Sequence, residues 1–230
     1  MTRIHDMGGR FGDGPVQPER EDGPVFHQDW QARALAVTLA AGALGQWNLD
    51  RSRHARECLS PQDYAAFGYY EKWLAGLADL LVETGLLSRD ELRQASGSAA
   101  PAAPPEALDP RALRSAKVAG ALAKGSPASR PSATPPAFAP GQAVRSLRPA
   151  ANRLSPGGHT RLPAYAAGAR GRVLRCHGAH VLPDSNAHGL GEAPEPLYAV
   201  AFPAAELWAA PEHPQDEVVL DLWQSYLEPA

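Results

Sequence analysis

A proline-rich segment in the middle of the chain constrains its fold more than any other feature. Nine of the 23 prolines fall within residues 96–140, among many alanines and serines. Because proline lacks a backbone donor and has a fixed φ, most of this segment is expected to be a linker. One helix is predicted within it, from Asp109-Pro110 to Lys124-Gly125, because an aspartate cap, a first-turn proline and a terminal glycine frame it.

Before the linker, apolar residues recur with the period of a helix. The clearest helix is predicted from Tyr69 to Thr84, with Gly85 as its C-terminal cap. Further helix starts are indicated by Asn48 or Asp50, by Ser60 before Pro61, and by Ser88 with Glu91. Residues 1–27 carry too many glycines and prolines for regular structure, so we expect an extended arm that lies on a partner.

After Gly141 the pattern changes to short runs rich in β-forming residues, separated by turns. The predicted strands are Ala143–Leu147, Gly171–His177, Leu197–Phe202 and Glu217–Trp223. Four or five short strands over about 85 residues favour a small antiparallel barrel. The fold class is therefore α+β. The predicted parts are an arm (1–27), a helical domain (28–95), a linker with one helix (96–137) and a barrel domain (138–230).

Charge and cysteine content exclude several classes of protein. A net charge of −3 from 22 basic and 25 acidic residues predicts no binding to nucleic acid or to an anionic membrane. With only Cys58 and Cys176, the chain has neither a disulfide framework nor a cysteine-rich metal site. Two unpaired thiols, together with no apolar signal segment between Met1 and Gly14, predict a cytoplasmic protein.

Two local patterns suggest chemistry but also have a structural interpretation. Gly9, Gly12 and Gly14 have the spacing of a phosphate-binding loop, yet no predicted strand precedes them and no predicted helix follows. Cys58 lies one helical turn from His54 and could act as a nucleophile. An extended arm and an ordinary buried thiol are the favoured interpretations.

In the C-terminal part, one group of residues could form a zinc site. Three histidines and a carboxylate occur close together, at His177, His180, Asp184 and His188. A structural loop is favoured, because Pro183, Asn186 and Gly189 between and beside them are typical of a surface turn.

The remaining candidates are ambiguous when each is taken alone. Arg53 and Arg161 are compatible with surface charges. Tyr69, Tyr70 and Trp73 have helical spacing and are compatible with core or interface aromatics. From its residues alone, the sequence predicts an α+β protein with an aromatic helix and an interaction arm.

Short motifs also follow one another in a fixed order. In the N-terminal part they are Ile4-His5-Asp6-x-Gly8-Gly9, Pro24-Val25-Phe26, Leu49-Asp50-x-x-Arg53-His54-x-x-Glu57 and Tyr69-Tyr70-Glu71-x-Trp73. In the C-terminal part they are Gly158-His159-Thr160-Arg161-Leu162-Pro163, His177-Gly178-Ala179-His180, His188-Gly189-x-Gly191-Glu192 and Asp221-Leu222-Trp223. Together they span about residues 4–90 and 138–227, and over this length the chain resembles nitrile hydratase β subunits.

The resemblance implies an enzyme that hydrates nitriles to amides. In that family the α subunit holds a non-haem Fe(III) or non-corrin Co(III) ion through a Cys-x-x-Cys-Ser-Cys segment, in which two cysteines are oxidised. This chain has no such segment, so the resemblance assigns it no metal ligand. The expected assembly is an αβ heterodimer or α2β2, the expected substrate is a small nitrile, and the C-terminal domain is expected to be an SH3-like barrel.

The resemblance also implies roles for individual residues. Arg53 and Arg161 match the arginines that reach the oxidised cysteines, and a planar guanidinium fork suits anionic sulfur oxygens. Tyr69 matches a tyrosine near the same site. The expected pocket residues are Leu49, Ser52, Tyr70 and Trp73. Ser52 stands where the family commonly has an aromatic residue, which is expected to enlarge the pocket. Lys72 stands where a histidine is common, which puts a proton-relay role at that position in doubt.

Two other hypotheses remain open. A thiocyanate hydrolase subunit is the first, although that enzyme splits the equivalent of this chain over two polypeptides. A non-catalytic activator or adaptor with an SH3-like barrel is the second. An unbroken chain of 230 residues argues against the first, and the presence of both Arg53 and Arg161 favours an enzyme over the second. The choice between iron and cobalt, the preferred nitrile and the attacking group are left open.

Overall fold

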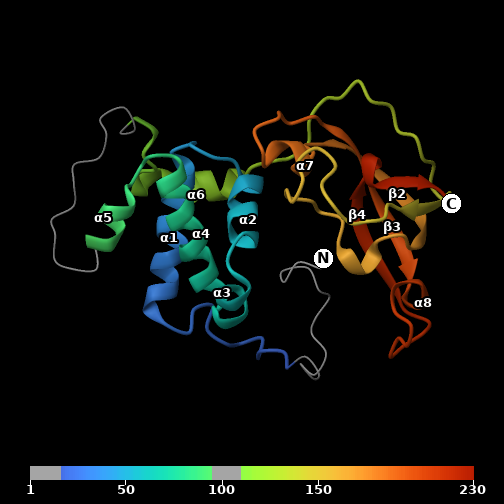
Figure 1. Ribbon diagram of the computed structural model, residues 1–230, viewed down its shortest axis with the longest axis horizontal. Helices are drawn as coiled ribbons and strands as arrows, with labels where there is room; N and C mark the ends of the chain where they lie inside the picture. Colours follow the sequence, from blue (N-terminus) through green and yellow to red (C-terminus); the bar gives the residue numbers. More distant parts are fainter. Residues whose placement is uncertain (1–16, 95–109) are drawn as a thin grey trace. The chain divides into compact units, whose positions relative to one another are not determined.

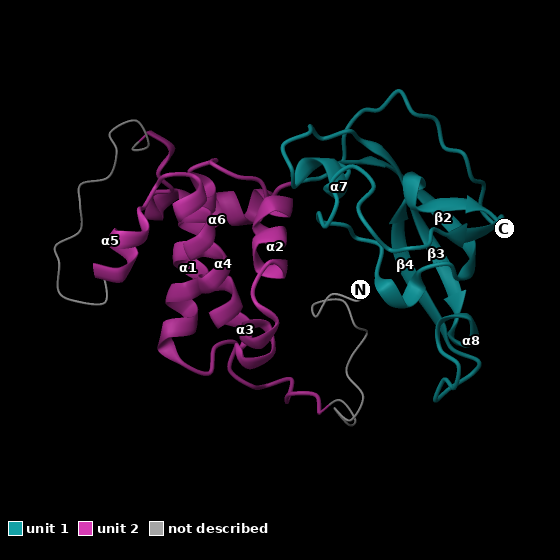
Figure 2. Ribbon diagram, viewed as in Figure 1, with its two compact units in different colours: residues 1–13, 127–230 teal, residues 14–126 magenta. Residues whose placement is uncertain are grey.

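The computed structural model describes residues 17–94 and 110–230 (Figure 1). Residues 17–94 and 110–126 belong to one compact unit, and residues 127–230 belong to a second (Figure 2). Most of the predicted arm lies outside the described residues, and its described part, 17–27, contains no helix or strand. No helix in the described part of the chain is both long enough and apolar enough to cross a membrane.

In the part of the first unit that the structure describes, the regular elements are all helices, as the periodicity predicts. Its helices are α1 (Asp29–Ala43), α2 (Leu49–Glu57), α3 (Pro61–Ala66), α4 (Tyr69–Glu83), α5 (Arg89–Gln94) and α6 (Ser115–Lys124). The side chain of Asn48, and not that of Asp50, caps α2 by accepting a hydrogen bond from the Arg51 amide at 2.9 Å. Ser60 caps α3 in the same way, and Gly85 ends α4 with a φ of +71°. The capping residues therefore set the helix boundaries.

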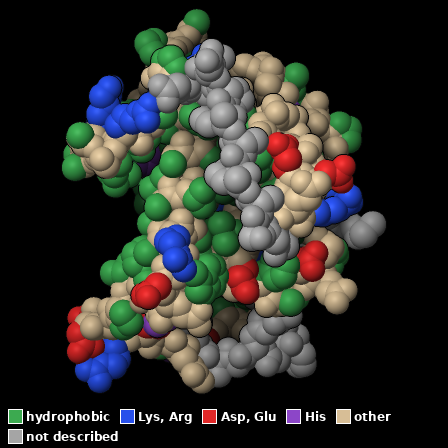
Figure 3. Space-filling model, turned by 90° about the vertical axis from the view of Figure 1, so that its left-hand side faces the viewer, with side chains coloured by type: hydrophobic (Ala, Val, Ile, Leu, Met, Phe, Trp, Pro, Cys, Tyr) green, Lys and Arg blue, Asp and Glu red, His purple; other side chains and the backbone are tan. Residues whose placement is uncertain are grey.

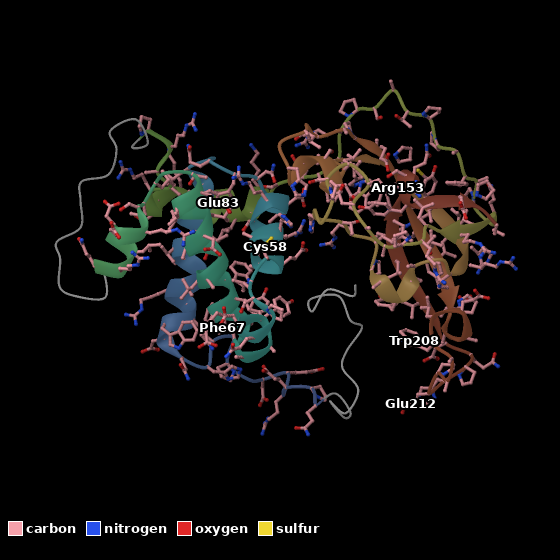
Figure 4. All side chains as sticks on the ribbon, viewed as in Figure 1. Cys58, Phe67, Glu83, Arg153, Trp208 and Glu212 are labelled. Atoms are coloured by element: carbon pink, nitrogen blue, oxygen red, sulfur yellow. The ribbon has the colours of Figure 1, made fainter. Side chains whose placement is uncertain are left out.

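Helices α2 and α4 pack closely and run in opposite directions. At one end, Arg51 of α2 pairs at 3.3 Å with Glu83 of α4, which is labelled in Figure 4. Toward the other end, a Cβ added at Gly76 would lie 2.8 Å from Cγ of Arg56. Glycine at this position lets the two helices approach, because any larger residue would displace the arginine stem.

The start predicted for the last helix of this unit is wrong. The helix predicted from Pro110 begins instead at Ser115, and Arg114, its N-cap, forms no side-chain cap hydrogen bond. The Arg111 guanidinium donates to the backbone oxygen of Leu44, after α1, at 3.3 Å. This tertiary hydrogen bond holds the preceding stretch outside the helix, and Gly125 with a φ of +62° ends α6.

The second unit is built on one antiparallel sheet. Its strands are β1 (Ala143–Ser146), β2 (Arg170–His180), β3 (Glu195–Pro203), β4 (Glu217–Trp223) and β5 (Leu227–Pro229), with short helices η2 (Ala164–Ala166), α7 (Pro183–Asn186), α8 (Ala204–Leu207) and η3 (Gln224–Tyr226). The strand order is β4-β3-β2-β1-β5. The predicted strands are confirmed and β2 is longer than expected, but the described sheet is not closed.

Strand β3 runs through the core of this unit, which explains its continuous apolar sequence. Its residues 196–202 are all buried. Its Tyr198 and Phe202 pack with large side chains from other strands and loops: Phe138, Val144, Leu162, Val173, Leu222 and Tyr226. This core fixes the strand ends and the loops that follow them.

Residues 127–137 lie along this sheet, although the predicted domain boundary falls after residue 137. The Arg130 guanidinium binds the Glu192 carboxylate through two nitrogens, each at 2.8 Å. The Arg130 amide donates to the backbone oxygen of Ala179 at 3.0 Å. Hydrogen bonds therefore attach this proline-containing segment to the sheet without making it a regular strand.

Candidate functional site

Helix α2 presents Arg53 with one fixed contact. One terminal nitrogen of its guanidinium donates to Oδ1 of Asp50 at 2.8 Å, and the two residues are one helical turn apart. The Asp50 side chain is 9% exposed, whereas that of Arg53 is 37% exposed. Within the described part of the chain no second hydrogen-bond partner of this guanidinium occurs. Asp50 thus orients Arg53 while most of its donors stay available.

Arg161 lies in a loop, and its backbone, not its side chain, is held. Its amide donates to the hydroxyl oxygen of Tyr226 at 3.1 Å. The Tyr226 hydroxyl in turn donates to the carboxylate of Asp184. The Arg161 side chain is exposed and forms no hydrogen bond or ion pair with the residues that the structure describes. The loop therefore offers a guanidinium with all its donors available.

The Tyr226–Asp184 pair is buried, and this changes how both groups ionise. Burial raises the pKa of the Asp184 carboxyl, and the hydrogen bond from Tyr226 partly opposes the shift. Burial is also the main cause that raises the pKa of Tyr226, followed by the nearby charge of Asp184. A tyrosine that stays protonated keeps its hydroxyl as a donor to Asp184 and an acceptor for the Arg161 amide.

The same loop is fixed at its base by Asn152. The Asn152 amide nitrogen donates to the backbone oxygens of His159, at 2.6 Å, and Asp184, at 2.9 Å. Its side-chain oxygen accepts from the amides of Leu154 and Ser155 at 2.8 and 2.9 Å. One buried side chain thus satisfies four backbone groups, three in the irregular segment before Arg161 and one in α7.

Glycine is required where this loop passes His188. A Cβ at Gly158 would lie 2.5 Å from Nε2 of His188 and 2.9 Å from Nδ2 of Asn152. The same His188 nitrogen accepts a hydrogen bond from the His159 amide at 2.9 Å. The Gly158-His159 motif therefore positions the loop that carries Arg161.

The four residues considered as a zinc set have different hydrogen-bond partners. His177 Nε2 lies 2.9 Å from Oδ1 of Asp221, and His180 Nε2 lies 3.2 Å from Oγ of Ser129. Asp184 accepts from Tyr226, and His188 accepts from the amide of His159. Their contacts agree with a structural role for the segment.

An aromatic cluster covers the beginning of α4. The rings of Tyr69 and Tyr70 are 5.1 Å apart, and their distances to the Trp73 ring are 5.6 and 6.1 Å. Phe26 extends the cluster, with its ring 5.7 Å from that of Tyr70. Tyr69 is nevertheless 66% exposed. The cluster is thus an accessible aromatic surface rather than a closed core.

Arg56 is a residue that the sequence pattern did not single out. Its guanidinium lies 4.6 Å from the centre of the Trp73 ring. Nε donates to the backbone oxygen of Ser52 at 3.0 Å, and a terminal nitrogen donates to Oγ of Ser52 at 3.3 Å. Burial lowers the pKa of Arg56. A glycine inside the predicted helix, Gly76, is the sequence feature that could have indicated a close helix contact at this position.

A second polar group lies near the end of α2. Cys58 is exposed, so the expectation of a buried thiol is wrong. Its Sγ lies 3.5 Å from Nε2 of His54, and Nδ1 of His54 lies 3.4 Å from the Glu57 carboxylate. The hydrogen bond with Cys58 and then that with Glu57 raise the pKa of His54 to about 9.

Comparison with known proteins decides among the hypotheses. A family model described as nitrile hydratase beta subunit, N-terminal, matches residues 1–118, and one described as nitrile hydratase beta subunit, C-terminal, matches residues 127–229. The chain belongs to the nitrile hydratase β-subunit family.

Relatives cover the chain from end to end. The low-molecular weight cobalt-containing nitrile hydratase subunit beta of Rhodococcus rhodochrous is 39% identical, over 100% of both chains. The nitrile hydratase subunit beta of Pseudomonas putida is 37% identical, also over 100% of both chains. The cobalt-containing subunit of Pseudonocardia thermophila is 35% identical, over 99% of this chain and 96% of its own. A solved thiocyanate hydrolase of Thiobacillus thioparus covers 42% of this chain and 78% of its own, with 25% identity and a TM-score of 0.36.

Most residues that the resemblance to nitrile hydratase β subunits singles out belong to the helical unit. Arg53, Ser52 and Leu49 lie on α2, and Leu49 is 56% exposed. Tyr69, Tyr70 and Trp73 lie on α4, which packs against α2. Arg161 belongs to the sheet unit. Lys72, at the position in doubt for a proton relay, lies with its ammonium 4.3 Å from the centre of the Tyr64 ring.

Proposed function

We propose that the chain, as a nitrile hydratase β subunit, completes an active site whose metal ion is held by an α subunit. Arg53 and Arg161 supply the groups that bind the oxidised cysteines of that subunit. The observation that carries this proposal is that both guanidiniums keep hydrogen-bond donors unused within the described chain. Both arginines suit an anionic sulfur ligand, because a guanidinium stays charged and offers a planar fork of donors.

Cobalt is the metal that the relatives support. Two of them, at 39% and 35% identity, are named as cobalt-containing. The two cysteines of this chain, Cys58 and Cys176, are too few for the metal-binding segment of the family. When bound in the α subunit, the metal supplies Lewis-acid activation of the nitrile. This chain then contributes orientation and substrate contacts, not metal ligands.

Two groups of residues have separate roles in this proposal. Arg53 and Arg161 donate hydrogen bonds to the oxidised sulfur groups and hold them in one orientation. Tyr69 lies close to the same groups, where its exposed hydroxyl can donate a hydrogen bond. The substrate pocket is lined by Leu49, Ser52, Tyr70 and Trp73, of which the aromatic rings are already in contact with one another.

The exposed apolar side chains of the helical unit support an α subunit as partner. On α1, Val37 and Leu39 remain exposed, and only Ala34 and Ala41 are buried. Figure 3 looks onto this unit and shows hydrophobic side chains exposed between charged ones. Association covers such surfaces. We further propose an α2β2 assembly in the cytoplasm, an arm at residues 1–27 that lies on the α subunit, and an SH3-like barrel topology for the antiparallel sheet.

The test is reconstitution with and without the α subunit. The purified chain alone is expected to form no amide from a nitrile and to bind no stoichiometric cobalt or iron. Co-expressed with the α subunit from the same source, it is expected to co-purify, to carry cobalt and to hydrate nitriles. Metal analysis and an amide-formation assay give the answer. Turnover or tight metal binding by the isolated chain would refute the proposal that the α subunit holds the metal.

A further inference from the structure

Arg56 occupies the space between α2 and α4. Its stem passes Gly76, where a Cβ would come within 2.8 Å of it. Its guanidinium reaches back one turn along α2 to the backbone oxygen and the hydroxyl of Ser52, at 3.0 and 3.3 Å. The same group lies over the Trp73 ring of α4, 4.6 Å from its centre. The cation is thus held between a serine and an indole by contacts that leave it little freedom.

No carboxylate neutralises this cation. Within residues 17–94 and 110–230, Arg56 forms no ion pair, and its only hydrogen-bond partner is Ser52. Glu57 attracts it only through longer-range electrostatics, while Arg53 repels it. Desolvation is the largest influence and lowers its pKa, so its surroundings disfavour the charged form. An anion placed beside it would compensate for this cost.

We propose that Arg56 determines substrate specificity, by binding a carboxylate or similar anionic group at the far end of a nitrile substrate. The inference rests on the proposed function, in which Ser52 and Trp73 line the substrate pocket. Arg56 touches both, and in this proposal its guanidinium extends the same lining. One terminal nitrogen, Nη1, has no hydrogen bond within the described residues and is free to donate.

The chemistry of the site favours a carboxylate over a neutral group. A guanidinium forms short, charge-assisted hydrogen bonds to carboxylates, often with two parallel donors. The indole stabilises the cation by a cation–π interaction and fixes the plane of the fork. A nitrile with only an aliphatic end would leave the partly desolvated cation without compensation. The substrate class is therefore nitriles that carry an acidic group remote from the cyano carbon.

A matched pair of substrates tests this inference on the αβ complex. The pair is 4-cyanobutanoate and 5-methylhexanenitrile, in which an isopropyl group replaces the carboxylate. Arg56→Met removes the charge and is expected to lower the kcat/KM ratio of acid to neutral nitrile about 10- to 100-fold, the usual worth of a hydrogen bond to a charged group. Arg56→Lys keeps the charge and should lose less. Ser52→Ala should lower the ratio only a few-fold, because it removes one anchor.

Arg51→Met is the control, because Arg51 lies on the same helix but pairs with Glu83. It should leave the ratio unchanged. An unchanged ratio in Arg56→Met, or an equal loss for both nitriles, would overturn the inference while leaving the proposed function intact. Loss of co-purification with the α subunit in Arg56→Met would also overturn it, since Arg56 would then bind a partner carboxylate. A wild-type complex that hydrates no nitrile at all would contradict the proposed function itself.

Discussion

The two units of the chain fix their arginines by different means. Arg53 lies on helix α2, where one buried carboxylate a turn away holds its guanidinium. Arg161 lies in a loop whose backbone is fixed by the buried side chains of Asn152 and Asp184 and by Tyr226. In the helical unit the secondary structure sets the direction of the side chain. In the sheet unit a polar network replaces it.

The two cores differ in the same way. The sheet unit buries large side chains such as Tyr198 and Phe202 completely. The helical unit buries chiefly alanines and two leucines, Leu77 and Leu80, and leaves Val37 47% exposed. The sheet unit is therefore stabilised mainly by apolar surface that it buries within itself. The helical unit leaves apolar surface exposed, which a partner could cover. The following changes test whether this difference governs function and stability.

The largest effect is expected from the arginines themselves. Arg53→Lys and Arg161→Lys keep the charge but lose the planar fork of donors. Each should lower kcat about 100-fold or more, the upper range for groups that orient metal ligands, which corresponds to about 2.7 kcal/mol. KM should change little, because in the proposed function the arginines act on the sulfur ligands and not on the nitrile.

The optical spectrum of the metal distinguishes this role from substrate binding. It should shift in both lysine variants, since the hydrogen bonds to the sulfur donors change. Trp73→Phe should change the range of accepted nitriles and leave the spectrum nearly unaltered. A change in KM alone, with an intact spectrum in both arginine variants, would make the arginines substrate-binding residues. A loss for only one of them would show that helix and loop do not contribute equally.

The next largest effect is expected where the loop is held. Asn152→Ala removes hydrogen bonds to four backbone groups. Because buried polar groups without partners are costly, the free energy of unfolding of the complex should fall by about 2 kcal/mol, measured by urea denaturation. Arg153→Ala is the matched control, because the side chain of this neighbouring residue, labelled in Figure 4, is exposed. It should change stability by less than about 0.5 kcal/mol. Equal stability of both variants would contradict the role of Asn152 in stabilising the loop.

The sequence predicted the helical unit well because its boundaries depend on local chemistry. Asn48, Ser60 and Gly85 act within one turn of the chain, so their effect can be recognised without knowledge of the fold. The predicted start of α6 was wrong because Arg111 forms a hydrogen bond to the backbone oxygen of Leu44, which is distant in sequence. Local cap patterns cannot anticipate a tertiary hydrogen bond of this kind.

The candidate site was predictable only in part. The matched motifs led to Arg53 and Arg161, but not to what holds them. The Tyr226–Asp184 contact joins residues 42 positions apart, and neither residue type indicates the other. Arg56 was missed because its contact with the Trp73 ring forms only when α2 packs on α4. Side-chain partners that depend on packing leave no periodic pattern in the sequence.

A pair of glycines tests how closely the helices of the first unit must pack. In α4, Gly76→Ala would place a methyl group 2.8 Å from the stem of Arg56. Overpacking should outweigh the better helix propensity of alanine, and we expect a net destabilisation of about 1.5 kcal/mol. Gly120→Ala in α6 meets nothing within 4 Å and should stabilise by about 0.5–1 kcal/mol. Urea denaturation of both complexes provides the comparison, and stabilisation by Gly76→Ala would contradict the tight contact.

The smallest effect concerns pH and the end of α2. Hydrogen bonds with Cys58 and Glu57 raise the pKa of His54 from 6.5 to about 9 in the folded chain. Since the folded pKa is the higher one, the charged imidazole contributes its full stabilisation below pH 6.5. That stabilisation is lost as the pH rises through 9. Cys58 is exposed, so solvent screening should reduce the contribution to about 1 kcal/mol.

Hydrogen exchange of the α2 amides, corrected for intrinsic rates, measures this local stability in the complex. Protection should fall between pH 6.5 and 9 in the wild type and should be flat in His54→Gln. Cys58→Ser should move the loss to lower pH, because it weakens the larger of the two causes while Glu57 remains. His27→Gln is the control, since His27 lies outside the helices, near Glu19 at 3.2 Å. If His54→Gln keeps the wild-type pH dependence, another group titrates, and helix α2 is held by packing and Asp50 rather than by the charge of His54.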